Sequence, residues 1–173
     1  MNTAEEILRS RAMALAQELE EKGDRPFDFE AAAFLLAHET YLVHTEYILG
    51  ITAAKGLTPI PCTPSFVLGV VNWHGKIISV LDLKKLFHLP ETERTDLSRV
   101  ILLGCMGIEL GVLVDRIAGI CSVRRAEIQK LLDSREGVSS EYIIGLDLEQ
   151  RILLNVEKLF SGRKMIVHEE VKR

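Results

Sequence analysis

The feature that most constrains the fold is a set of three short segments that recur, in the same order, in the second half of the chain. One has six residues with an internal glycine, one has three and ends in glycine, and one has five and ends in Leu-Phe. They are residues 46–51 and 115–120, residues 67–69 and 143–145, and residues 83–87 and 156–160. Three matches in one order favour two related units over chance similarity between apolar strands.

The segments around these matches have the pattern of short strands. Residues 32–37 and 41–43 are apolar on either side of a polar turn, and residues 66–73 and 76–83 flank a turn that contains Gly75. Glycine takes a positive φ without steric cost, so both pairs predict β-hairpins. The long helix that a parallel crossover needs is missing between the strands. We therefore predict two small barrels rather than a sandwich or a doubly wound sheet.

Each predicted unit is too small to bury a large share of its own surface. We expect the two units to pack against each other or to exchange strands. Ahead of them, residues 3–22 predict an amphipathic helix, because Thr3 and Glu6 fit a capping box and apolar residues recur at helical spacing. This helix has two open roles: packing on the body of the protein, or contact with a partner.

The composition limits the classes of partner and the compartment. The 173 residues are 47% hydrophobic and 27% charged, with a formal net charge of -4. A mildly acidic chain gains nothing from counterion release, so we expect no nucleic-acid partner. No apolar segment reaches membrane-spanning length, so we expect no direct membrane insertion. The first residues lack a basic flank and apolar run, and the three cysteines are far apart, which predicts a cytoplasmic protein.

No motif for catalysis, cofactor binding or metal binding stands out. The five histidines lack the spacing of a zinc site, and the twelve glycines form no phosphate-binding loop. Asp82 and Asp115 each follow an apolar strand, where a carboxylate can act as a general acid or base. Such a residue more often accepts hydrogen bonds from the next turn, and this interpretation is favoured. The sequence therefore predicts a non-enzyme.

A chain without reactive groups points to a function in protein–protein interaction. Trp73, the single tryptophan, directly precedes the predicted turn at Gly75. Its large amphipathic ring suits an interface anchor, and it equally suits a place in the core.

One long run carries a family resemblance. Residues 60–83 read Ile-Pro-x-x-Pro-Ser-Phe-Val-Leu-Gly-Val-Val-Asn-x-x-Gly-x-Ile-x-x-Val-x-Asp-Leu. This run, with residues 39–41, 111–115 and 143–160, resembles CheW-like chemotaxis coupling proteins over about residues 30–162. The resemblance implies an all-β fold of two small intertwined five-stranded barrels around a shared hydrophobic groove. The N-terminal helix and the short helical turns are predicted from the residues, and the helix lies outside the core pattern of the family.

Under this resemblance the chain divides into three parts. They are an N-terminal helix and linker at 1–25, a CheW-like domain at 26–165, and a tail at 166–173. Within the domain, the first barrel is expected at about 40–90 and the second at about 30–38 together with 96–165.

The resemblance also implies a function without catalysis. Members are adaptors that hold the regulatory domain of a CheA-type histidine kinase and the cytoplasmic helical tip of a chemoreceptor, the latter by a helix-in-groove contact. No catalytic, metal or cofactor residues are expected. The expected partner-binding residues are Ile48, Gly50, Gly69, Trp73, His74, Gly111, Ile117 and Ile120.

Two of these positions depart from the family pattern. His74 stands where the family usually has an arginine, and Gly50 stands where an acidic residue is common. Histidine lacks the fork that binds carboxylates bidentately, so the partner surface is altered. Two alternatives therefore stay open. One is a CheW-like regulator of a specialised motility or pilus pathway that binds the kinase but no ordinary receptor. The other is a small enzyme with a scattered site around Asp82 or His74.

Overall fold

The computed structural model describes residues 28–130 and 140–162. The predicted N-terminal helix and the predicted C-terminal tail lie outside these residues. The described part is mostly strand, as predicted. The strands are β1 Phe29–Leu36, β2 Glu39–His44, β3 Ile48–Ala53, β4 Val67–Trp73, β5 Lys76–Asp82, β6 Arg99–Cys105, β7 Ile108–Val114, β8 Arg116–Val123, β9 Ile143–Leu146 and β10 Ile152–Leu154.

Short helical segments connect some of these strands. They are α2 Leu83–Leu86, α3 Val156–Ser161, and the 3-10 turns η1 Thr45–Tyr47, η2 Arg125–Glu127 and η3 Ser140–Tyr142. No helix among the described residues has the length and apolar character needed to span a membrane.

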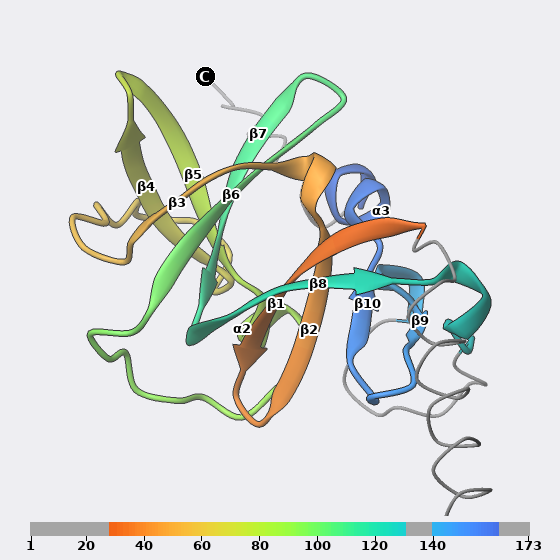
Figure 1. Cartoon of the computed structure of the whole chain (residues 1–173). Coiled ribbons are helices and arrows are strands. Elements are labelled where there is room, and N and C mark those ends of the chain that lie inside the picture. The colour runs from red at the N-terminus through yellow and green to blue at the C-terminus, as the bar shows by residue number, and fades with distance from the viewer. Residues whose placement is uncertain (1–27, 131–139, 163–173) are drawn as a thin grey trace, which may run out of the picture.

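The strands form two five-stranded sheets with the same internal plan (Figure 1). Sheet A has the order β8-β1-β2-β10-β9, and sheet B has the order β3-β6-β7-β5-β4. In each sheet an antiparallel hairpin from one half of the chain inserts between strands from the other half. Its second strand makes the one parallel pairing of that sheet, β2 with β10 and β7 with β5. The predicted exchange of strands between two related units is therefore present.

The exchange corrects the predicted barrel boundaries. The first barrel was expected from residues 40–90 alone, and residues 96–165 were assigned to the second. Instead, β6 and β7 pair with β3 and β5 in sheet B, while β2 lies in sheet A. Hairpins pair locally whichever sheet they join, so their sequence does not determine the sheet.

The repeated segments occupy equivalent places in the two sheets. Residues 67–69 and 143–145 start β4 and β9, and both strands are bulged there. A Cβ atom on Gly69 would lie 2.1 Å from the carbonyl oxygen of Thr58, and one on Gly145 would lie 2.4 Å from that of Gln129. Both positions therefore require glycine, because a backbone crosses at close range.

Those crossings bring each sheet close to closure. Thr58 bridges Val70, and Gln129 bridges Leu146, each as an isolated antiparallel pair. The chain that leaves β3 thus returns to β4, and the chain that leaves β8 returns to β9. The sheets are incompletely closed barrels, since only one bridge completes each circuit.

Side chains alternate between two environments along the strands. On β7, Leu110, Val112 and Val114 face a core shared by the two sheets, while Leu113 faces a separate core of sheet B. Both short helices cover the shared core, through residues such as Leu83 on α2 and Phe160 on α3. Sheet A has its own smaller core around Phe29, Ala33, Leu42 and Val123.

Asp82 accepts a hydrogen bond from the turn that follows it, as the favoured interpretation predicted, whereas the partners of Asp115 come from distant parts of the chain. Asp82 is the N-cap of α2, and its Oδ1 accepts from the Lys84 backbone N–H at 2.9 Å. Asp115 accepts from the Ala37 backbone N–H and pairs with the Lys84 ammonium group. The Lys84 side chain is 3% exposed and the Asp115 side chain 20%, so this ion pair is largely buried beside the first hairpin.

Candidate partner-binding surface

Three of the eight predicted partner-binding residues meet at one end of sheet B. Gly50 lies in the edge strand β3, Trp73 ends β4, and His74 follows it in the turn. A Cβ atom on Gly50 would lie 2.5 Å from Cζ2 of Trp73, so the indole occupies the space of a side chain at that position. The rings of Trp73 and His74 meet edge to face, with their centroids 4.4 Å apart. We refer to Gly50, Trp73 and His74 as the aromatic corner.

The local sequence explains how this corner is held. Trp73 pairs with Lys76, which leaves a two-residue loop of His74 and Gly75. Both loop residues have positive φ, 49° and 83°, as the twist of a tight hairpin demands. The Asn72 side-chain oxygen accepts from the Gly75 backbone N–H at 2.9 Å. His74 is therefore presented at the hairpin tip and is exposed.

Trp73 combines the two roles that the sequence left open. It is half-buried, and its ring packs against the separate core of sheet B, around Val71, Ile78 and Val80. Its remaining surface faces solvent beside His74. A partner at this corner would meet an aromatic surface with no fixed charge on the three residues.

Two predicted glycines are buried and not surface groups. Gly69 makes the close backbone crossing with Thr58 described above. Gly111 lies in β7, where a Cβ atom would lie 2.8 Å from Val100 Cγ1 and 3.1 Å from Val80 Cγ2. Both glycines therefore shape the sheet, and neither offers a side chain to a partner.

The three predicted isoleucines lie on the edge strands β3 and β8. Ile48 and Ile117 occupy equivalent places in the two units and pack against the shared core. Ile120 is 69% exposed, and its equivalent Ile51 is 44% exposed. Both edges thus place one isoleucine in the core and one in solvent.

Exposed apolar residues that the sequence reasoning missed lie near the tips of two hairpins. Met106 and Ile108 form the tip between β6 and β7, and Ile77 lies near the tip between β4 and β5. An ion pair of 2.7 Å between Lys76 and Glu109 joins these two hairpins. Alternation along β5 and β7 separates Ile77 and Ile108 from the core-facing positions of these strands. The sequence alone does not show where the shared core ends, so it does not identify these two residues as exposed.

The pKa values of Tyr47 and Cys105 are both raised. Burial, followed by the nearby Glu157 and Glu46, raises the pKa of Tyr47 to about 12. Burial is also the largest cause that raises the pKa of the Cys105 thiol. A nucleophilic cysteine needs a lowered pKa. In residues 28–130 and 140–162, no group of three or more His, Cys, Asp or Glu side chains could hold a metal ion.

Fold and surface together define a class: a strand-exchanged double β-unit with exposed apolar edges. The CheW-like domain family matches residues 30–164, and the chain belongs to this family. That match covers both sheets, and it supports the adaptor class that the sequence predicts.

Known relatives agree with this assignment. The chain is 31% identical to chemotaxis protein CheW of Treponema pallidum over 79% of this chain and 85% of the relative. It is 30% identical to protein FrzA of Myxococcus xanthus, over 69% and 77% of the two chains. The crystal structure of the scaffolding protein TtCheW from Thermoanaerobacter tengcongensis shares the fold, with a TM-score of 0.74 at 24% identity, over 83% of this chain and 95% of that one.

Proposed function

We propose that this protein is a non-catalytic adaptor that couples the helical tip of a chemoreceptor to the regulatory domain of a CheA-type histidine kinase. The observation that carries the proposal is the family match, which spans both strand-exchanged sheets. A cytoplasmic location belongs to the same proposal.

The contact with the receptor is proposed to be mainly apolar. Ile120 and Ile51 supply exposed aliphatic area on equivalent edge strands, and a helix can lay its apolar face against such a surface. The aromatic corner adds an uncharged anchor, because tryptophan contributes large contact area at low entropic cost. Burial of these groups on binding would provide most of the affinity.

The aromatic corner also defines how this adaptor would differ from its relatives. The family pattern has an acidic residue and an arginine where this chain has Gly50 and His74. With both removed, attraction by charge at this corner is weak, so binding should depend little on salt. A receptor with an aromatic or aliphatic residue opposite Trp73 would suit the corner.

Separate binding measurements test the two partners. The purified chain is titrated with the kinase regulatory domain and, in a second experiment, with a receptor cytoplasmic fragment. We expect a dissociation constant in the micromolar range or below for each, which requires about 8 kcal/mol. Binding to neither partner would remove the proposal.

The kinase-only regulator is a second candidate, and a specific observation favours it. Trp73 fills the space beside Gly50 that a charged side chain would need. In this case the kinase domain binds and the receptor fragment does not, with His74→Arg as the comparison variant. The two candidates are thus separated by the receptor titration alone.

A further inference from the structure

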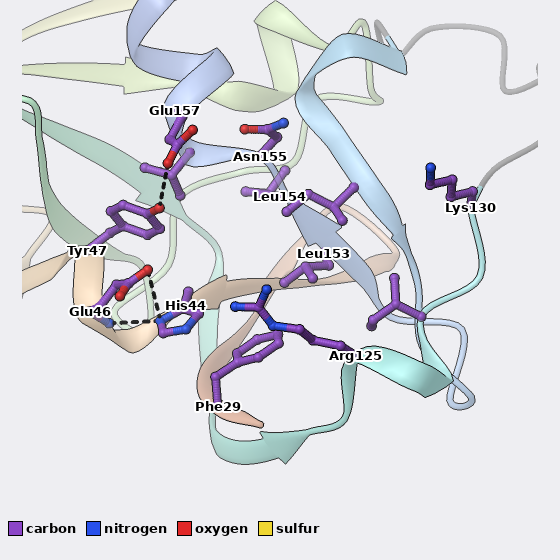
Figure 2. A pocket seen from close by; sticks show the side chains of 13 residues that line it. Phe29, His44, Glu46, Tyr47, Arg125, Lys130, Leu153, Leu154, Asn155 and Glu157 are labelled. Carbon is purple, nitrogen blue, oxygen red and sulfur yellow. Dashed lines mark hydrogen bonds and ion pairs between the residues drawn. The ribbon is translucent and has the colours of Figure 1, made fainter. Parts of the chain in front are cut away.

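A pocket of about 400 Å³ lies on sheet A (Figure 2). It is bounded by the start of β1, the turns η1 and η2, the strands β9 and β10, and the start of α3. None of the eight predicted partner-binding residues lines it. Its volume is within the range of pockets that hold small organic ligands.

The pocket wall is largely apolar, with one aromatic platform. Phe29 from β1 and His44 from the end of β2 stack face to face, with ring centroids 4.5 Å apart and planes 12° apart. The aliphatic lining residues are Ile128, Ile144, Leu153, Leu154 and Val156. A flat or branched apolar group would bury area against both kinds of surface.

Two cations on the pocket wall have no acidic partner among the residues that the structure describes. The Arg125 guanidinium carbon lies 5.8 Å from the centroid of the Phe29 ring, and Lys130 lines the pocket farther along the chain. Among residues 28–130 and 140–162, no carboxylate forms an ion pair with either side chain. The Arg125 backbone N–H donates to Asp28, which holds the turn η2 against β1.

The acidic lining residues, in contrast, are engaged within the protein. Glu46 lies 3.6 Å from His44 Nδ1, and Glu157 accepts from the Tyr47 hydroxyl at 3.3 Å. Figure 2 shows these contacts on the wall opposite Lys130. Both carboxylates already have partners within the protein, so Arg125, beside the stacked rings of Phe29 and His44, is placed to attract an anionic group.

We propose that this pocket binds a small organic carboxylate with an aromatic or branched apolar body. The body lies against Phe29, His44 and the aliphatic wall. The carboxylate pairs with Arg125, whose planar fork matches it bidentately. The site is separate from the aromatic corner, and its occupation does not depend on the adaptor function.

The test is an NMR titration of the ¹⁵N-labelled full chain with two matched probes. The probes are 3-phenylpropionate and its neutral analogue 3-phenylpropionamide. We expect saturable shifts of the Phe29, Ile128 and Leu153 amides with the carboxylate and markedly weaker binding of the amide. Arg125→Gln should weaken carboxylate binding about tenfold or more, because a charge-assisted hydrogen bond is lost.

A matched variant and a peptide separate this proposal from its alternatives. Arg116→Gln removes an exposed cation on β8 outside the pocket, and it should leave the dissociation constant unchanged. Equal binding of both probes, no saturation at millimolar concentration, or an unchanged constant in Arg125→Gln would overturn the proposal. Tighter binding of an acetylated, amidated acidic peptide at the same amides would also overturn it, since it would make the pocket a peptide site. The probe comparison on the unmodified chain stays decisive even if a variant misfolds.

Discussion

Replacement of Gly50 by alanine tests whether the aromatic corner is built as described. The new methyl group would lie 2.5 Å from Cζ2 and 2.9 Å from Cη2 of Trp73, so the indole must move. Overpacking of a filled site costs about 1–3 kcal/mol. The loss of a strand glycine returns about 0.5–1 kcal/mol. The expected net fall in the free energy of unfolding is therefore at most about 2.5 kcal/mol.

The assay uses the fact that Trp73 is the only tryptophan in the chain. Its fluorescence emission should shift to longer wavelength in Gly50→Ala as the ring leaves the sheet-B core for water. Urea unfolding measures the stability change in the same samples. Gly50→Ala combined with Trp73→Leu should recover most of the lost stability, because the smaller side chain leaves room for the methyl group.

Gly104→Ala is the matched control on the same sheet. A Cβ atom there would meet Leu49 Cδ1 at 2.9 Å, which is the movable end of a flexible side chain. We expect a smaller stability change and unchanged emission. An unshifted emission spectrum in Gly50→Ala, with stability equal to that of the unmodified protein, would refute the described seating of Trp73.

Three further predictions follow from other contacts. Lys84→Met should lower the free energy of unfolding by about 2–4 kcal/mol in urea titrations, because Asp115 loses its buried partner. Lys85→Met is the control on the same turn, where Lys85 lies 3.8 Å from Glu91, and it should change the free energy of unfolding by less than about 0.5 kcal/mol. A loss no greater than that of Lys85→Met would contradict the buried ion pair. Ile120→Ser should weaken receptor-fragment binding at least tenfold in calorimetry. Its stability should be unchanged, since Ile120 is 69% exposed. Equal affinity of the variant would show that Ile120 is not part of the receptor-binding surface. Because the folded-state pKa of Tyr47 is raised to about 12, its contribution to stability is present below about pH 10 and is lost as pH rises toward 12. Tyr47→Phe should remove this alkaline loss of stability. A variant whose stability falls with pH as in the unmodified protein would contradict the prediction.

Local features of the fold could be predicted from the sequence because neighbouring residues determine them. Both early hairpins, the helical turn α2 and the N-cap role of Asp82 depend on alternation, turn residues and one capping oxygen within a few positions. The repeat also led correctly to related units, since its glycines occupy the same bulged starts of β4 and β9.

Longer-range features could not be predicted in this way. An inserted hairpin has the same alternation in either sheet, so the membership of β6 and β7 in sheet B was missed. Gly50 and Trp73 are separated by a proline-rich loop, and only the folded register of sheet B brings them into contact. The pocket beside Arg125 joins seven separate elements, and no sequence spacing indicates it.

The central claim is that this protein acts by bringing a receptor and a kinase together. The most direct measurement is kinase autophosphorylation in the presence of receptor-containing membranes, with and without the purified chain. We expect a receptor-dependent change in phosphorylation rate when the chain is added. A rate that is the same with and without it would contradict coupling.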